Sequence, residues 1–141
     1  MFEVINSQRK IKIKTAVFQV FAGKIAEIVA ETKNKTFTVA FVSDRRMREL
    51  NKTFRGKNST TDVLSFPYQT DEFEIETENL GDIVISLEQA ARQAEDNNLD
   101  FETEIKQLIL HGVLHLRGYD HETDQGEMNA IELEFRDKLK I

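Results

Sequence analysis

Residues 36–42, with the sequence TFTVAFV, decide the fold that we expect, because they join β-branched and aromatic residues in one short apolar run. Such a run favours a buried strand. Ser43 follows directly and is a good N-cap, and the helix after it would turn Met47, Leu50 and Phe54 inward. A buried strand that leads at once into an amphipathic helix is typical of layered α/β folds.

The segments before and after this strand–helix unit also alternate between strand and helix character. Three more have strand character, namely residues 2–6 (FEVIN), 62–66 (DVLSF, which Pro67 would stop) and 80–86 (LGDIVIS). Further helices are expected over 14–31, from the N-cap Ser86 to about Asn97, from the N-cap Asp100 to Gly118, and from the N-cap Thr123 along Met128, Ile131, Phe135 and Leu139. Only an acidic, irregular segment separates the third strand from the fourth, so these two strands can pair antiparallel.

The expected fold class is therefore α/β (α+β), a single domain over residues 1–141 with a mixed four-stranded sheet, one antiparallel strand and about five helices. The absence of cysteine excludes disulfides and thiolate ligands. The N-terminus lacks an apolar secretion core, and no run approaches the roughly 20 apolar residues that a bilayer span requires. We therefore expect a cytoplasmic protein that does not enter a membrane.

The charge is unevenly distributed along the chain. A net charge of −6 argues against a nonspecific nucleic-acid binder, which is usually basic. Nevertheless, six basic residues gather between positions 45 and 57, opposed only by Glu49: Arg45, Arg46, Arg48, Lys52, Arg55 and Lys57. This segment is either a local basic surface or an ordinary solvated helix face, and the sequence leaves both interpretations open.

The stretch HGVLHLRGYDH, residues 111–121, contains all three histidines of the chain. His111 and His115 are four residues apart, so on a helix they share one face and lie about 6 Å apart along the axis. Gly118 would end that helix and let His121 turn back as a third ligand. Three protein ligands leave one tetrahedral position open, as in catalytic zinc sites. The sequence therefore predicts a site for one metal ion, with zinc as the default.

Two neighbours of the histidines bear on the chemistry of this site. Asp120 either orients an imidazole or is only a turn residue. The spacing also resembles the metzincin protease signature HExxHxxGxxH, but Gly112 stands where that signature requires a glutamate as general base. Asp120 and Glu122 are close by, yet neither occupies the helix face of the missing glutamate. A metzincin-like metalloprotease is therefore the weaker alternative.

The histidine stretch, together with NKTFRGKNSTTDVLSF at 51–66 and LGDIVIS at 80–86, resembles the YbeY family of bacterial metal-dependent endoribonucleases, also called rRNA maturation factors. The resemblance implies that His111, His115 and His121 bind one zinc ion. It also implies that Arg55 is functionally important. It further implies a role in ribosomal RNA processing, chiefly at the 3′ end of the small-subunit 16S RNA, and in ribosome quality control.

A chemical hypothesis follows for cleavage of RNA. Zinc would polarise the phosphate or lower the pKa of a water to about 7, while Arg55 neutralises charge that develops in the transition state. The nucleophile stays open between water and the ribose 2′-hydroxyl. Thr61, Asp62 and Ser65 either shape a substrate groove or are ordinary strand residues.

A third alternative belongs to another functional class. The chain would then be a noncatalytic RNA-binding ribosome assembly factor, and its metal would only stabilise the fold. The acidic total implies weak affinity for naked RNA. The small ribosomal subunit, or proteins associated with the ribosome, would in that case present the RNA.

Overall fold

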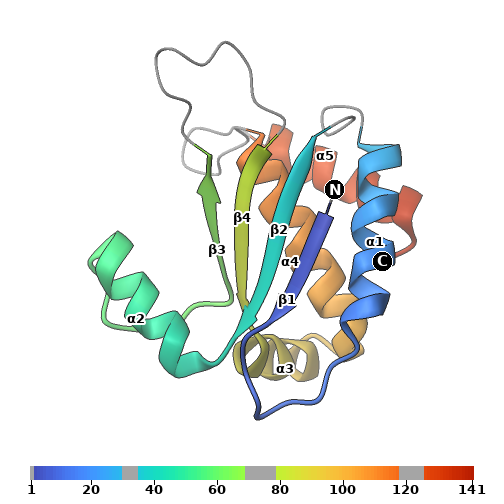
Figure 1. Cartoon of the computed structure of the whole chain (residues 1–141). Helices are drawn as coiled ribbons and strands as arrows, with labels where there is room; N and C mark the ends of the chain where they lie inside the picture. Colours follow the sequence, from blue (N-terminus) through green and yellow to red (C-terminus); the bar gives the residue numbers. More distant parts are fainter. Residues whose placement is uncertain (1, 30–34, 69–78, 118–125) are drawn as a thin grey trace, which may run out of the picture.

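The computed structural model describes residues 2–29, 35–68, 79–117 and 126–141. Strands and helices alternate along this part of the chain, as expected (Figure 1). In chain order the elements are β1 (Phe2–Asn6), α1 (Thr15–Ile28), β2 (Thr36–Val42), α2 (Asp44–Arg55), β3 (Val63–Pro67), β4 (Asn79–Ser86), α3 (Leu87–Asp96), α4 (Phe101–Leu116) and α5 (Glu127–Leu139).

The four strands form one mixed sheet in the order β1-β2-β4-β3. β2 is parallel to both β1 and β4, whereas β3 is antiparallel to β4, with Ser65 opposite Ile83. The predicted mixed sheet with one antiparallel strand is therefore confirmed. β3 lies at an edge of the sheet, beside the central strand β4.

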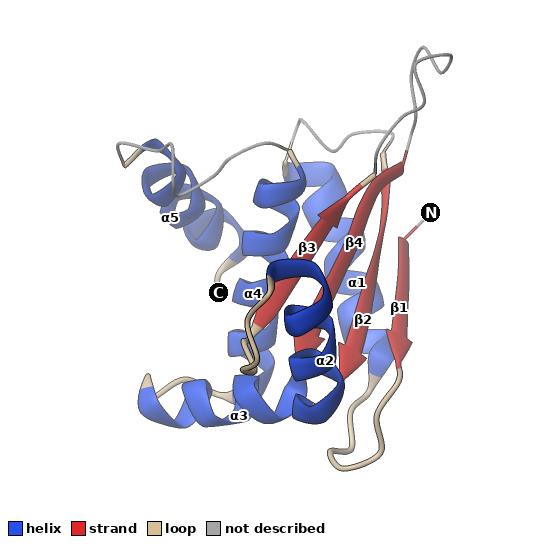
Figure 2. Cartoon of the chain, turned by 90° about the vertical axis from the view of Figure 1, so that its left-hand side faces the viewer, coloured by secondary structure: helices blue, strands red, loops and turns tan. Residues whose placement is uncertain are grey.

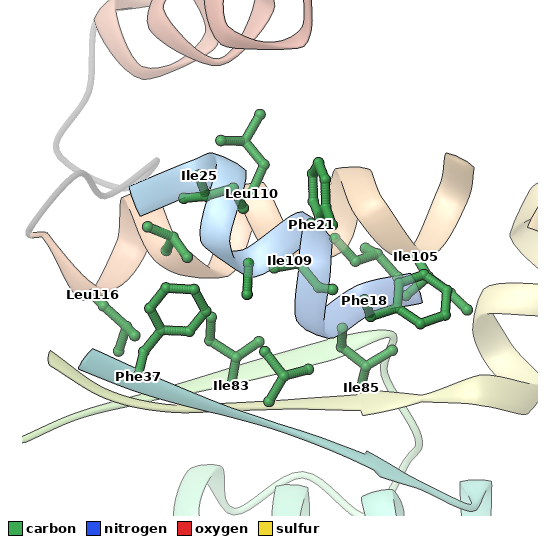
Figure 3. Packing of buried hydrophobic residues seen from close by; sticks show 14 of the residues in the cluster. Phe18, Phe21, Ile25, Phe37, Ile83, Ile85, Ile105, Ile109, Leu110 and Leu116 are labelled. Carbon is green, nitrogen blue, oxygen red and sulfur yellow. The ribbon is translucent and has the colours of Figure 1, made fainter. Parts of the chain in front are cut away.

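The helices cover the two faces of the sheet unequally (Figure 2). α1 and α4 pack on one face, where Figure 3 shows Ile83 and Ile85 of β4 facing Ile109 of α4 and Phe18 of α1. α2 packs on the other face over a smaller cluster of Val42, Met47, Leu64 and Val84. The larger core gives α4 a rigid base, which matters because α4 bears two histidines.

Asp44 anchors the first turn of α2 to the rest of the molecule. Its carboxylate accepts hydrogen bonds from Ser86 Oγ at 2.6 Å, Arg92 Nη2 at 2.6 Å and Thr60 Oγ1 at 3.1 Å. Burial alone would raise the pKa of Asp44, but these hydrogen bonds outweigh burial and hold the pKa below its ordinary value. The position of α2 is thus tied to α3 and to the segment that leads into β3.

Gly112 brings the backbone of α4 unusually close to the sheet. A Cβ atom at this position would lie 2.8 Å from Cγ2 of Ile83, and 3.0 Å from two further atoms of the same side chain. Ile83 is fully buried in β4 and is β-branched, so it has little freedom to move aside. Position 112 therefore tolerates no side chain without displacing the core.

One sequence expectation about a side chain was wrong, and one strand end differs from the expected one by a single residue. Phe54 is 63% exposed rather than inward, because it lies in the last turn of α2 beside the sheet edge. There its ring meets the ring of Phe66 at a centroid distance of 5.1 Å. β3 ends at Pro67 as expected, but Pro67 is the last residue of the strand rather than the one after it, since the outer side of an edge strand needs no N–H donor.

Several helix ends also differ from the expected ones. α1 ends at Ile28 because Val29 is extended, and α4 ends at Leu116. Gly118 and Thr123 lie outside the described residues, and Gly126 occupies the N-cap position of α5. Among the described helices, none combines the length and apolar character that a membrane span requires.

The close approach at Gly112 makes a prediction about stability. Gly112→Ala should overpack the contact with Ile83, at a cost of about 1–3 kcal/mol. Gly23→Ala is the matched control, because Gly23 also lies in a helix but a Cβ there meets no atom within 4 Å. We expect Gly23→Ala to stabilise the protein by about 0.5–1 kcal/mol. Urea unfolding measures both changes, and equal stabilisation of the two variants would show that the contact imposes no constraint.

Candidate functional site

α4 carries the two described histidines in its last turns, as the sequence predicts. Asp100 caps the helix by accepting a hydrogen bond from Thr103 N at 2.7 Å. His111 and His115 lie on one helix face, with their rings 4.6 Å apart and their Nε2 atoms 3.0 Å apart. Two imidazole nitrogens are thus directed at a common point.

Glu132 of α5 fixes the orientation of His111. Its Oε1 lies 2.7 Å from His111 Nδ1, and its Oε2 accepts a hydrogen bond from Arg136 Nη2 at 2.9 Å. Glu132 is only 7% exposed. An ionised carboxylate can only accept hydrogen bonds, so Glu132 in that form pairs with the tautomer of His111 that carries its hydrogen on Nδ1 and presents a lone pair on Nε2. This carboxylate–imidazole arrangement is the one that orients histidine ligands in metal sites.

The geometry of the histidine pair fits two ligands of one zinc ion. Zn–N bonds of about 2.0–2.1 Å at a tetrahedral angle place two nitrogens about 3.3 Å apart, and the observed separation is 3.0 Å. Among the residues that the structure describes, no group of three or more histidine or acidic side chains is arranged to hold a metal. His121, the predicted third ligand, and Asp120 lie outside these residues, so both stay predictions.

Arg55 is exposed and ends α2, on the opposite face of the sheet from α4. No described hydrogen bond or ion pair joins Arg55 to either histidine of α4. Both elements nevertheless meet β3 at neighbouring residues. Phe54 contacts Phe66 on one face of the sheet, and Ser65 Oγ donates a hydrogen bond to the carbonyl oxygen of Gly112 on the other face, at 3.4 Å. The two parts of the predicted site therefore flank the same section of an edge strand.

A cleft of about 770 Å³ opens beside His111, between α3, α4, α5 and the residue that precedes β3. Its polar lining is mostly carboxylates and amides, including Asp62, Glu104 and Glu132. The sequence interpretation considered Asp62 for a substrate groove but missed both glutamates. A signal for Glu132 existed, because it adjoins the apolar stripe of the last helix. For Glu104 the sequence held no such signal apart from its helical spacing to His111.

Glu104 is a buried carboxyl in this cleft, with 5% of its surface exposed. Burial raises its pKa above the ordinary value, and the negative charge of Asp62 adds to this effect. Hydrogen bonding by Asn97 and the charge of Arg136 oppose it in part. The Gln93 amide nitrogen, oriented toward the acids, donates to both Glu104 Oε1 and Asp62 Oδ2 at 3.2 Å.

The raised pKa of Glu104 makes stability depend on pH. Between the ordinary and the raised pKa, the folded protein binds more protons than the unfolded chain, so stability falls as the pH rises. Glu104→Gln removes this loss of stability at higher pH, because glutamine does not ionise. We therefore expect the variant to be more stable than wild type at pH 7. The difference should disappear in acid, below the ordinary pKa of about 4.3.

Thermal unfolding across this pH range measures the effect. Glu102→Gln, at an exposed position on the same helix, is the control that should not gain stability at neutral pH. A Glu104→Gln variant that shows no gain at pH 7 would contradict the assignment.

Comparisons with known proteins agree with the motifs. A family model described as Endoribonuclease YbeY matches residues 3–140. Endoribonuclease YbeY of Thermodesulfovibrio yellowstonii is 38% identical, over 98% of this chain and 96% of that protein. The protein of the same name in Clostridioides difficile is 41% identical, over 91% and 92%.

The fold has a solved counterpart as well. The solution structure of a Thermotoga maritima protein is similar with a TM-score of 0.68 and 27% identity, over 99% of this chain and 89% of that one. The family model spans nearly the whole sequence, and relatives more than 30% identical match most of it. The chain therefore belongs to the YbeY endoribonuclease family.

Proposed function

We propose that this chain is a zinc-dependent endoribonuclease that cleaves single-stranded ribosomal RNA in the cytoplasm. Its role would be maturation of the 3′ end of 16S rRNA and ribosome quality control, with the small subunit and ribosome-associated proteins as partners. The observation that carries the proposal is the histidine pair, whose Nε2 atoms lie 3.0 Å apart beside a buried carboxylate. Membership of an endoribonuclease family supports RNA as the substrate.

Each residue has a distinct task in this proposal. His111 and His115, with His121 as the third ligand, would hold one zinc ion. When bound, the zinc supplies Lewis-acid stabilisation of the reacting phosphate. Glu132 holds the His111 ring through its Nδ1 atom, which would leave Nε2 to bind the ion. Arg55 would place a guanidinium against the phosphate oxygens as their charge increases.

Gly112 bears on the metalloprotease alternative. A side chain at this position would run into Ile83 in the core between α4 and β4. The chain thus lacks the general base of the protease signature at position 112 and has no free space for it there. No contact in the described residues favours peptide hydrolysis over RNA cleavage.

One assay separates the three candidate functions. Zinc-loaded, chelated and His115→Ala proteins are incubated with structured RNA that contains single-stranded segments, and with casein. We expect only the zinc-loaded wild type to cleave RNA and none to cleave casein. Because traces of ribonuclease would survive the mutation, His115→Ala also controls for contamination. Casein cleavage would identify a protease, and an inert wild type would indicate a noncatalytic assembly factor.

The same assay tests Arg55. Arg55→Ala should keep its zinc but cleave RNA about 100-fold more slowly or worse, which is the usual effect of removing one charge-stabilising donor. Lys24→Ala, which removes an exposed cation from α1, is the control and should cleave normally. Unchanged cleavage by Arg55→Ala would remove Arg55 from the site.

Glu132 allows a test that does not depend on activity. Glu132→Gln preserves shape but weakens the hold on the His111 ring, and loss of such a partner typically lowers metal affinity about 10- to 100-fold. Glu134→Gln is the control on the same helix, where Glu134 is exposed and pairs with Lys138. Competition with a chromophoric chelator measures zinc affinity. Equal affinities of the two variants would show that Glu132 does not orient a ligand.

A further inference from the structure

Four basic side chains lie along one side of α2 at intervals of three or four residues: Arg45, Arg48, Lys52 and Arg55. This spacing keeps them on a single helix face, away from the buried Met47. All four are exposed. We call this set the basic stripe. From Arg45 to Arg55 the stripe extends about 15 Å along the helix axis.

The positive charge of the basic stripe is largely unneutralised. Glu49 lies 4.0 Å from Arg45 and 3.0 Å from Arg46, and exposed pairs of this kind contribute little. Within the described part of the chain, no carboxylate forms an ion pair with Arg48, Lys52 or Arg55. The other acid of the helix, Asp44, is occupied by Ser86, Arg92 and Thr60. In a chain of net charge −6, α2 thus presents a local surface suited to a polyanion.

An exposed aromatic ring lies beside the C-terminal end of the basic stripe, about 100° around α2 from Arg55 and on the side of the helix that faces the sheet. Phe54, adjacent to Arg55, is 63% exposed, and its ring meets Phe66 edge to face at 5.1 Å. Cations that follow a phosphate backbone, combined with an aromatic ring on which a base stacks, are characteristic of surfaces for single-stranded nucleic acid. An acidic peptide has no base to stack, and a duplex keeps its base faces buried. The ring therefore favours a single strand as the occupant.

Helix α2 meets the edge strand β3 at its last turn, which carries both Phe54 and Arg55. Phe66 meets Phe54 on the α2 face of β3, whereas the preceding residue, Ser65, contacts Gly112 on the α4 face. Figure 2 shows α2 and α4 on either side of β3. A single strand of nucleic acid that follows α2 from Arg45 toward Arg55 thus arrives at the edge of the sheet. His111 lies beyond that edge.

We propose that the basic stripe and Phe54 bind single-stranded RNA and direct it across the edge of β3 to the histidines. The stripe contacts phosphates, and Phe54 stacks on a base. A stacked strand advances about 3.4 Å per nucleotide along its axis, so the stripe lies alongside about four nucleotides. This inference rests on the proposed function, which supplies RNA as the substrate.

The first experiment measures binding without cleavage. All proteins carry His115→Ala, and fluorescence anisotropy follows a labelled single-stranded RNA over a range of salt concentrations. The test variant is Arg45→Gln/Arg48→Gln/Lys52→Gln, which leaves Arg55 in place. Each phosphate contact on a single strand contributes about 0.7 to the slope of log affinity against log salt. The triple variant should therefore bind more weakly and reduce this slope by about 2.

The matched control removes the same charge elsewhere. Arg9→Gln/Lys12→Gln/Lys24→Gln changes three exposed cations near or on α1, and its slope should equal that of the parent protein. Circular dichroism verifies that both triple variants fold. Equal slopes for the two triple variants would overturn the proposal.

The second experiment tests stacking. Phe54→Ala should weaken binding of single-stranded RNA about 5- to 150-fold, the range expected for one base–aromatic stack, and should leave binding of inorganic polyphosphate unchanged. Val20→Ala removes an equally exposed apolar side chain from α1 and should bind RNA normally.

Three results would overturn the proposal: equal RNA affinity of the Phe54→Ala and Val20→Ala variants, equal loss of RNA and polyphosphate binding, or binding of polyglutamate as tight as that of RNA. Because binding is measured in a protein that does not cleave, a failure here is distinct from a failure of the proposed nuclease activity.

Discussion

The contact between Gly112 and Ile83 is the constraint on which the placement of the candidate site depends. It sets the distance between α4 and the sheet, since any side chain at position 112 would displace a fully buried residue of β4. The residue before Gly112 is His111, so the same contact determines how far the imidazole stands from the sheet. Two adjacent positions of α4 thus set the packing of the helix against the sheet, through Gly112, and the position of the imidazole, through His111.

The electrostatics divide the molecule into two unlike regions around β3. On one face, α2 exposes several cations and an aromatic ring. On the other, the cleft beside His111 is lined by carboxylates and amides, with Arg136 bound to Glu132. The cations of the first region attract phosphates, whereas the acidic cleft would accept a phosphate only with a cation bound beside it. The carboxylates of the cleft can accept hydrogen bonds at base edges, and its amides can both accept and donate them. The division suits a substrate that carries both kinds of group.

Local patterns predicted the elements that depend on short stretches of sequence. Ser43, Ser86 and Asp100 cap their helices as expected, because capping involves residues only three positions apart. The shared face of His111 and His115 follows from helical spacing for the same reason. The antiparallel pairing of β3 with β4 was also predicted, from the single loop between them.

Features that depend on tertiary contacts were harder to predict. Glu132 meets His111 from another helix, 21 positions along the chain, and no spacing rule relates the two. The cleft around Glu104 exists only once three helices are assembled. Phe54 has the periodicity of an inward residue, but the sheet ends beside it and leaves the ring exposed. His121, Asp120 and the role of Arg55 stay predictions from the sequence.

Ser65 and Phe66 are neighbours on β3, and the register of this strand decides which of the two side chains faces α4 and which faces α2 when the chain folds. Successive residues of a strand point to opposite faces, so a slip of one position against β4 would exchange the two side chains. Phe66 would then turn toward α4, and α2 would lose its aromatic contact. The pairing of Ser65 with Ile83 therefore fixes the face that each side chain takes, and β3 can contact α2 through Phe66 and α4 through Ser65 only in molecules that acquire this register.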